Sequence, residues 1–503
     1  MIHKLGAAFS LLCASVAGCA SLSPDAKIKE AVDLVEQHVG GRPAWTAPWD
    51  DAPPAWDGQS VLSLDEAVVL AVRNNRELRA DLEMIGQANA DLVQAGLLQN
   101  PVINFMAMFP EGGGRAMLRS NAFPLQALQE LWLIPAREKV AAAELQKAVL
   151  RVADRAVETA AEVKRVYARI QFTQRSVQLV RDNLELVEQA TRLIQVQFTS
   201  GKATQVEVNV SRIRHLRLQS ELWAMEAENR NLKRELLMLM GFATASDVWT
   251  VTPLDELHDL LEDPPTEEGL LALAESQRLD LKAAEWNLTA AERRIALMKR
   301  EGWPELALGL TFERSPAPRS QNPTVAGRLG NAAAQGLTGG TAEKPAFTPF
   351  RPKDREVKYT LGPMIEMEVP IFDRNQAQVA KAVHEYNQTL AEYEARWQEI
   401  AWKVRENLVT YAQACEQVRF FRDAIIPEVD RNLRLVQQSY RAGAEELTVY
   451  LQVQEDLIMN RRTLLEFLRD AAVTRADLER HVGGRLEITD TAPRDDARTD
   501  PEE

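Results

Sequence analysis

Residues 357–369 read VKYTLGPMIEMEV, and every second residue in this stretch is apolar. The apolar set is Val357, Tyr359, Leu361, Pro363, Ile365, Met367 and Val369. The set between them contains Lys358, Thr360, Gly362, Glu366 and Glu368, with Met364 as the exception. Because side chains alternate between the two faces of a strand, this period of two predicts a strand with one apolar and one polar face.

The same period recurs in other parts of the chain. It predicts strands at residues 304–313 and 357–371, and two less regular strands within residues 100–134. A soluble sheet over a core would also alternate, but these strands stand isolated among predicted helices. Strands that cross a membrane need about 9–11 residues with an apolar outer face. We therefore predict four membrane strands per chain.

A very long helix follows each pair of predicted strands, at residues 136–199 and 374–440. Residues 136–198 contain no proline or glycine, which predicts a helix of about 95 Å at 1.5 Å per residue. Apolar residues recur in both helices at spacings of three and four, which is typical of coiled-coil seams. Pro427 is expected to kink the second helix.

The chain contains two copies of one plan, which is helix, strand, loop, strand, long helix, glycine turn and return helix. The aligned positions are residues 75–80 with 278–283, Pro101 with Pro304, Gly201 with Gly443, and Gly241 with Gly483. The second copy is longer because it contains a polar loop rich in glycine and proline, residues 315–355.

These features divide the sequence into six parts. They are a signal peptide (1–18), an N-terminal strap (19–60), a first repeat (61–241), a linker (242–265), a second repeat (266–484) and a disordered tail (485–503). The return helices are expected at residues 203–240 and 445–482. Three tryptophans of the strap, Trp45, Trp49 and Trp56, are either contacts for a neighbouring surface or incidental loop aromatics.

The N-terminus carries an export signal. Residues 5–17 are mostly apolar, too short for a membrane helix, and lead into Val16-Ala17-Gly18-Cys19. Small residues directly before a cysteine resemble the lipobox of bacterial lipoproteins, which implies a lipid on Cys19. An ordinary signal peptide with an incidental cysteine is the alternative. After processing, Cys415 is the one unmodified cysteine, so no disulfide is expected.

Composition argues against several functions. The net charge of −14 disfavours nucleic acid, whose phosphates attract a basic face. Residues 201–204 (GKAT) resemble a phosphate-binding loop but lack its upstream glycine and follow a helix. The six histidines are scattered, so no metal site is predicted, and no cofactor motif is present. We expect no enzyme activity.

Four strands cannot close a barrel, and an open strand edge in hydrocarbon leaves backbone groups unsatisfied. Two chains would form an eight-stranded barrel filled by its own side chains, whereas three chains supply twelve strands and room for a passage. The predicted fold is therefore a trimeric twelve-stranded barrel continued by a long helical tube. Glu366 and Glu368 are candidate lumen residues, although a solvated acidic face explains them equally well.

The sequence resembles the outer-membrane efflux protein (TolC-like) family, lipoprotein branch, over nearly all of the mature chain. The residues that carry the resemblance are 64–67 (LDEA), Asn75, Leu78, 94–101 (QAGLLQNP), 131–137 (LWLIPAR), 362–363 (GP) and 369–373 (VPIFD). The resemblance implies a homotrimer in the outer membrane, a periplasmic helical tunnel, and two partners, which are a periplasmic adaptor (membrane fusion) protein and an inner-membrane pump.

The resemblance also implies that two helix tips meet the adaptor. The corresponding residues are Phe198, Gly201, Thr204, Tyr440, Gly443 and Leu447, which would be helix ends in any case. Better-studied members close the tip with acidic residues after the second turn, and residues 447–452 contain no aspartate. We place the constriction at Val449 and Gln452. The competing class is a periplasmic coiled-coil lipoprotein that acts as a tether or scaffold. The exported substrate is not identified by the sequence.

Overall fold

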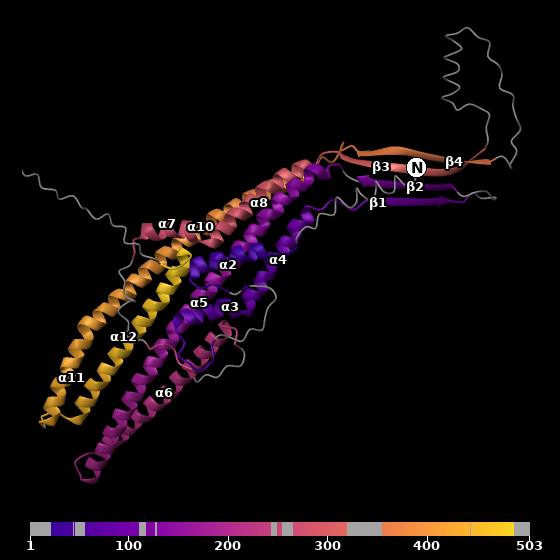
Figure 1. Cartoon of the computed structure of the whole chain (residues 1–503). Helices are drawn as coiled ribbons and strands as arrows, with labels where there is room; N and C mark the ends of the chain where they lie inside the picture. The colour runs from indigo at the N-terminus through magenta and orange to yellow at the C-terminus, as the bar shows by residue number, and fades with distance from the viewer. Residues whose placement is uncertain are drawn as a thin grey trace, which may run out of the picture. The chain divides into compact units, whose positions relative to one another are not determined.

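The computed structural model describes residues 22–43, 45, 56–109, 117–125, 128–242, 249–253, 265–318, 355–442 and 444–486 (Figure 1). The chain forms two compact units. The sheet unit comprises Gln94–Val140 and Ala291–Glu385. The helical unit comprises Met1–Val93, Ala141–Ala290 and Tyr386–Glu503. Cys19, Trp49 and the predicted tail from residue 487 onward lie outside the described residues.

The sheet unit contains an antiparallel four-stranded sheet in the order β1-β2-β3-β4. The strands are β1 (Val102–Met108), β2 (Met117–Leu125), β3 (Glu305–Pro318) and β4 (Arg355–Glu368). Strands β1 and β4 form its two edges, and among the described residues neither has a second strand partner. The prediction of four strands per chain is confirmed.

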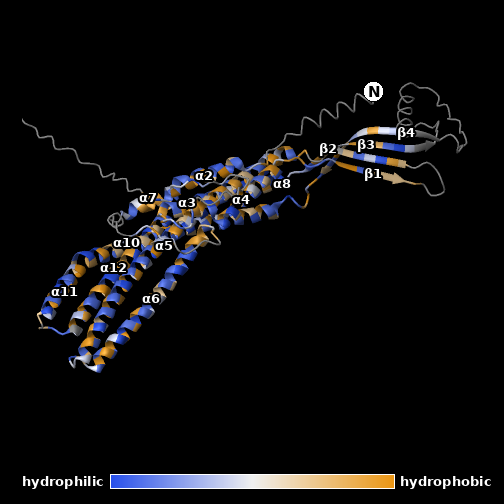
Figure 2. Ribbon diagram, turned by 60° about the horizontal axis from the view of Figure 1, so that its bottom comes forward, coloured by the Kyte–Doolittle hydropathy of each residue, from blue (hydrophilic) through white to orange (hydrophobic). Residues whose placement is uncertain are grey.

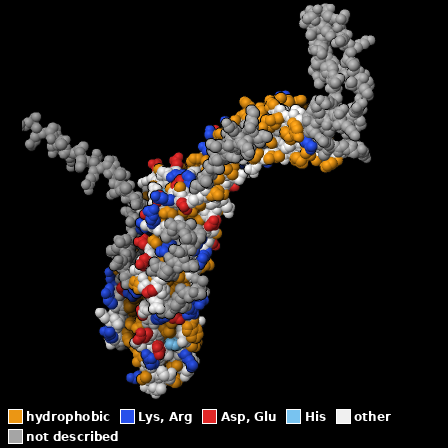
Figure 3. All heavy atoms as spheres, turned by 45° about the vertical axis from the view of Figure 1, so that its right-hand side comes forward, with side chains coloured by type: hydrophobic (Ala, Val, Ile, Leu, Met, Phe, Trp, Pro, Cys, Tyr) orange, Lys and Arg blue, Asp and Glu red, His pale blue; other side chains and the backbone are white. Residues whose placement is uncertain are grey.

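The register of the sheet keeps most of its apolar residues on one face. In β3 and β4, Leu308 lies opposite Ile365, and Leu310 lies opposite Pro363. The same row continues through Ala122 of β2 to Ile103 of β1. Leu361, Ile365 and Ile103 are largely exposed, and Figure 3 shows hydrophobic side chains gathered over the sheet. This apolar face therefore has no covering layer among the described residues.

Several predicted boundaries were wrong. Residues 130–134 are helical, because helix α5 (Glu130–Thr199) begins before Pro135 and not after it. The helix begins early because its buried face extends across Pro135. Spacings of three and four place Leu133, Ala136 and Val140 on this face, where they pack against Leu297. Strand β3 runs to Pro318, into the predicted loop, and β4 ends at Glu368.

Two helical hairpins dominate the helical unit. The first consists of α5 and its return helix α6 (Gln205–Leu239). The second consists of α10 (Gln376–Phe420), a π-helical turn (Phe421–Ile425), α11 (Ile426–Arg441) and the return helix α12 (Leu447–Val482). Hydrophobic and hydrophilic residues alternate along both hairpins in Figure 2, as their seams require.

Pro427 interrupts the second long helix, so that the single helix predicted at residues 374–440 is two α-helices joined by a π turn. The π turn ends at Ile425, and Pro427 is the second residue of α11. Proline lacks the N–H that would bond to the carbonyl four residues earlier, and its ring crowds that carbonyl. A π turn is a known way to accommodate such a disruption.

A pair of shorter helices meets beside the C-terminus of the return helix in each repeat. Helices α3 (Leu64–Asn74) and α4 (Arg76–Ala95) meet at Asn75 in the first repeat. Helices α7 (Glu267–Gln277) and α8 (Leu279–Glu301) meet at Arg278 in the second. We call these two places the first and second joints. They occupy equivalent positions in the repeat alignment.

The N-terminal strap packs into the helical unit. Helix α2 (Asp25–Val39) buries Ala31, Val35 and Val39 in the main core. The Trp45 Nε1 group donates a hydrogen bond to the Val72 carbonyl at 3.0 Å. Trp56 packs edge-on against Trp249 of the linker. Trp45 and Trp56 are therefore core residues of the chain itself, which neither sequence interpretation anticipated.

Candidate functional site

The second face of the sheet is polar. Arg119 of β2 and Glu313 of β3 form an ion pair at 3.0 Å across this face. Asn104 lies opposite Asn121, which lies opposite Thr311. The predicted lumen residues Glu366 and Glu368 lie on the same face in β4, and both are exposed. One sheet thus separates an apolar surface from a polar one.

Acidic residues gather where the polar face meets the helices of the sheet unit. Glu305 lies opposite Glu368, and with Glu301 and Asp373 they line a pocket of about 210 Å³. Burial raises the pKa of Glu301, and nearby Arg137 partly opposes this rise. The pocket gives this end of the polar face a negative potential.

The first tip, residues 198–204, is a closely hydrogen-bonded turn. Gly201 adopts a φ of +73°, which favours glycine. The Lys202 amide donates to the Gln197 carbonyl at 2.8 Å. Thr204 and Glu207 then form a capping box at the start of α6, because each side chain accepts a hydrogen bond from the other residue's backbone amide. Phe198 is exposed beside this turn.

The second tip, residues 440–447, is built differently. Helix α12 begins at Leu447 after Glu446, whose side chain makes no capping hydrogen bond. Instead, the rings of Tyr440 and Tyr450 stack with centroids 5.7 Å apart. Gly443 lies outside the described residues. Sequence reasoning missed this stacking, although an aromatic residue on each side of a glycine turn was a usable signal.

The predicted constriction residues lie just beyond the second tip. Val449 and Gln452 are three residues apart on α12, and both are exposed. Next to them, Leu451 is buried against Ile194 of α5 and Val208 of α6. Arg214 of α6 also forms an ion pair with Glu455 of α12. The second hairpin therefore contacts the first near the tips, through one apolar cluster and one ion pair.

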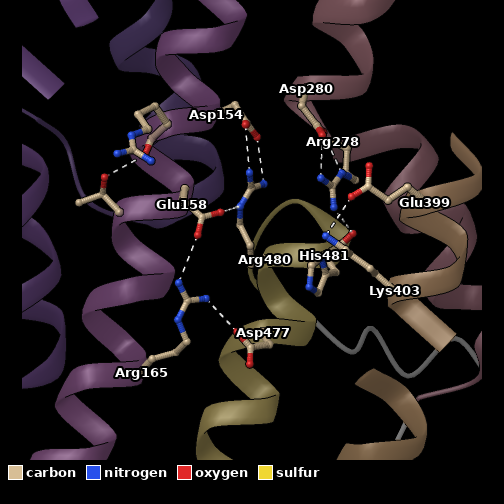
Figure 4. Close-up of polar contacts among 12 residues, drawn as sticks. Asp154, Glu158, Arg165, Arg278, Asp280, Glu399, Lys403, Asp477, Arg480 and His481 are labelled. Atoms are coloured by element: carbon tan, nitrogen blue, oxygen red, sulfur yellow. Dashed lines mark hydrogen bonds and ion pairs between the residues drawn. The ribbon is translucent and has the colours of Figure 1, made fainter. Parts of the chain in front are cut away.

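A cluster of partly buried ion pairs joins α12 to α5 (Figure 4). Two guanidinium nitrogens of Arg480 each lie 3.0 Å from a carboxylate oxygen of Asp154. Arg480 also donates to Glu158, and Arg165 bridges Glu158 to Asp477 at 3.2 and 2.8 Å. We call these five residues the ion-pair cluster.

Burial and pairing oppose each other in this cluster. Burial raises the pKa of Asp154 in spite of the attraction of Arg480. Burial would also raise the pKa of Glu158, but hydrogen bonds from Arg480 and Arg165 outweigh it, so that this pKa is lowered. Burial, together with the nearby charges of Arg278 and Lys403, lowers the pKa of His481 from 6.5 to about 4.

Both joints are bonded to the C-terminus of a return helix, the first through a neutral side chain and the second through a charged one. At the first joint, the Asn75 side chain donates to the Leu239 carbonyl at 3.1 Å and accepts from the amides of Glu77 and Leu78. At the second joint, Arg278 donates to the His481 carbonyl at 2.9 Å. Arg278 also forms a bidentate ion pair with Asp280, at 2.7 and 2.8 Å.

The remaining features limit the chemistry available. Within the described ranges, no three histidine, cysteine, aspartate or glutamate side chains come close enough to hold a metal ion. In the same part of the chain, no helix combines the length and apolar character needed to cross a bilayer. The sheet, with one apolar and one polar face, and the long helical hairpins are the features that define the class of the protein. That class is an outer-membrane channel subunit.

Comparison with known proteins agrees with this class. A profile of the family described as outer membrane efflux protein matches residues 67–241 and 270–484. The chain belongs to this outer membrane efflux protein family. It is thus an outer-membrane efflux channel, in a family of conduits and not of enzymes. A search of curated protein sequences gave no match.

Solved structures show the same fold. A membrane protein from Pseudomonas aeruginosa aligns with a TM-score of 0.64 at 19% identity, covering 88% of this chain and 99% of that one. The open state of the MtrE outer membrane channel of Neisseria gonorrhoeae gives 0.63 at 16% identity, with coverage of 84% and 89%. The outer membrane protein VceC from Vibrio cholerae gives 0.60 at 15%, with 84% and 97%.

Proposed function

We propose that three copies of this chain form one passive conduit from the periplasm to the exterior. The observation that carries the proposal is the sheet, which has a continuous apolar face and two unpaired edges. Each unpaired backbone group in hydrocarbon costs several kcal/mol. Pairing β1 of one copy with β4 of the next removes every edge, and three sheets supply the twelve strands of an open barrel. A tether or scaffold would need no such sheet.

In this arrangement the polar face lines the passage. Glu366, Glu368 and the Arg119–Glu313 pair would then contact the transported substrate and its water. In this proposal the energy for export comes from an inner-membrane pump. Selection inside the conduit is by size and lining charge.

The helix tips are the proposed contact with a periplasmic adaptor. The proposed contact residues are Phe198, Gly201 and Thr204 in the first tip, which are all exposed, and Tyr440, Gly443 and Leu447 in the second. Val449 and Gln452 are the proposed constriction beside the second tip. A conduit that ends at an adaptor needs a gate at this end, and these side chains are uncharged.

The proposed lipid on Cys19 would lie close in sequence to the first described residue, Leu22. The Leu22 carbonyl accepts a hydrogen bond from the Asn89 side chain of α4 at 3.2 Å. Cys19 precedes Leu22 by three residues in the sequence. The lipid would anchor the N-terminus to the outer membrane beside the barrel. Labelled palmitate should enter the wild-type chain and not a Cys19→Ala variant.

Conductance across a planar lipid bilayer tests the conduit. We expect stepwise conductance from the purified detergent-solubilised protein. A variant with Leu308→Arg and Ile365→Arg on the apolar face should insert poorly, because arginine at mid-membrane costs roughly 2–4 kcal/mol per residue. The matched control is Thr311→Arg on the polar face, which should insert normally. A chain that stays monomeric in aqueous buffer after removal of residues 1–19 would contradict the proposal.

A further inference from the structure

The polar face of the sheet carries three methionines that the strand pairing brings together. Side chains alternate along β1, so Met106 and Met108 lie on this face. Met108 is directly opposite Met117 of β2, and Met106 is opposite Arg119, whose ion pair with Glu313 belongs to the same face. Residues 106, 108 and 117 form no compact motif in the sequence, and only the register assembles them. We call these three residues the methionine cluster.

Methionine is distributed unequally between the two faces. Among the described side chains of the strands, the large apolar residues on the polar face are Val102, Met106, Met108, Met117 and Met364. The apolar face is built mainly from leucine, isoleucine and aromatic residues, and Met367 is its one methionine among the same described side chains. Residues that only fill space would draw on leucine and isoleucine on both faces. The difference indicates that the polar face uses methionine for its sulfur.

The spacing of the three residues allows their sulfur atoms to meet. Residues directly opposite in an antiparallel pair have Cβ atoms about 5 Å apart, and second neighbours along one strand are about 7 Å apart. Methionine is unbranched and has three rotatable side-chain bonds, so each sulfur can move across such a gap. Met106 and Met108 are 51% and 45% exposed and Met117 is half-buried, so none of them is fixed in a core. Three thioethers can therefore converge on one ligand above the β1–β2 pair.

Thioether sulfur determines the chemistry of that ligand. It is uncharged and polarizable, and soft sulfur ligands select copper(I), whereas magnesium and calcium prefer oxygen. Arg119, which lies opposite Met106, is paired with Glu313 at 3.0 Å, so its positive charge is balanced locally. We propose that the methionine cluster binds a soft monovalent metal ion, copper(I) or silver(I).

Harder ions have no equivalent site in the part of the chain that the structure describes. Zinc(II) is bound in proteins by histidine, cysteine and carboxylate side chains. Within that part, no three such side chains lie close enough to hold an ion. The described residues therefore favour a soft monovalent ion over zinc(II).

The methionine cluster would act as a transit site and not as a store. This step rests on the proposed function, because the polar face lines a passage only in the conduit. An ion in transit must bind well enough to enter and weakly enough to leave. Neutral thioethers meet this condition better than thiolates, whose negative charge adds attraction. The inference names soft monovalent metal ions as a substrate class of the conduit.

Silver binding to the purified detergent-solubilised protein tests the site. Silver(I) is the probe because it shares the charge and softness of copper(I) and is not oxidised in air. Every protein compared carries Cys415→Ala, since a thiol also binds silver(I). The test variant adds Met106→Leu, Met108→Leu and Met117→Leu, which keep the apolar character and nearly the volume. Calorimetric titration should show silver affinity roughly tenfold or more weaker in the test variant, because losing even outer-shell partners of a metal costs about 10- to 100-fold.

Met364→Leu is the matched control, because Met364 lies on the same face in β4 and outside the methionine cluster. Its sulfur accepts a hydrogen bond from the Thr311 hydroxyl at 3.5 Å, so this control also removes a thioether from the polar face. Its silver affinity should equal that of the Cys415→Ala parent. Zinc(II) should bind the parent and the test variant alike. Circular dichroism checks that the test variant is folded, and Met117→Leu alone makes the same comparison if it is not.

The outcomes separate this inference from the proposed function. Equal silver affinity of the parent and the test variant, with stepwise conductance in both, would overturn the metal site and leave the conduit standing. Equal losses in the test variant and in Met364→Leu would also overturn the site, because any thioether would then suffice. Cluster-dependent silver binding in a protein without conductance would support the binding site and overturn its role in transit together with the conduit.

Discussion

The two joints of the repeat show one backbone design stabilised by two kinds of chemistry. At both, a side chain at the break between two helices donates to a carbonyl at the C-terminus of the return helix, Leu239 in one case and His481 in the other. The first joint achieves this with neutral Asn75. The second uses Arg278 with Asp280, next to the ion-pair cluster of Arg480.

The comparison also shows a difference between the two return helices. Arg480 aligns with Met238, an exposed residue of α6, and Asp154 aligns with Arg396. The pair of Arg480 with Asp154 therefore has no equivalent on α6, because uncharged Met238 stands at the aligned position. Buried ion pairs depend strongly on both partners being present, so the second joint is the more vulnerable of the two.

Removing Arg480 should have the largest effect. Arg480→Met, which installs the residue found in the first repeat, leaves the partly buried Asp154 carboxylate without its bidentate partner. We expect the free energy of unfolding to fall by about 3–5 kcal/mol. The reciprocal Met238→Arg, at an exposed site, should change it by no more than about 0.5 kcal/mol. Denaturant unfolding in detergent, followed by circular dichroism, measures both, and equal losses would contradict the comparison.

Transferring the first joint's chemistry to the second should have the next largest effect. Arg278→Asn alone leaves Asp280 without its bidentate partner and should cost about 2–3 kcal/mol. Adding Asp280→Ala removes the unpaired carboxylate and should restore the free energy of unfolding to within about 1 kcal/mol of the wild type. If the double variant is no more stable than the single one, the ionic pairing is not what distinguishes the joints.

Acidification should weaken the second joint through His481. The pKa of this residue falls from 6.5 in the unfolded chain to about 4 in the folded protein. The unfolded state therefore binds the proton first, and the stability contributed by neutral His481 is lost as pH falls from 6.5 to 4. We expect a loss of about 1–2 kcal/mol, allowing for solvent screening of a partly exposed ring.

His481→Leu, the residue at the aligned position 239, isolates this contribution. The variant should lose less stability than the wild type between pH 6.5 and pH 4. Both proteins carry the same carboxylates, so the difference between their pH profiles reports the histidine. Superimposable profiles would show that His481 has no part in acid sensitivity.

The two tips should show the smallest difference. Thr204→Ala removes the capping box of α6 and should cost about 1 kcal/mol locally. Glu446→Ala, at the matched position before α12, should cost little because that side chain makes no capping hydrogen bond. Amide hydrogen exchange at residues 205–208 and 447–450 distinguishes them. Faster exchange at the second site alone would reverse the expected order.

Local patterns predicted the sheet and the hairpins. The alternation at residues 357–369 specified β4 because each strand residue is assigned to a face by its own position. The predicted start of α5 at residue 136 is too late, because the buried spacing of Leu133, Ala136 and Val140 continues across Pro135.

The ion-pair cluster could not be predicted in this way. Arg480 lies more than 300 residues from Asp154 and Glu158 in the sequence, so no local period reports their contact. The repeat alignment gives part of the information. Arg278 aligns with the neutral Asn75, and a charged residue at a joint needs a partner of opposite charge. The tip residues and Cys19 remain predictions.

The mass of the detergent-solubilised protein tests the central claim most directly. If each sheet supplies four strands to a shared barrel, native mass spectrometry should show a species of three chains that persists without a cross-linker. A stable single chain, or a two-chain species with the sheet intact, would contradict the account, because neither can form the open twelve-stranded barrel that the polar face requires.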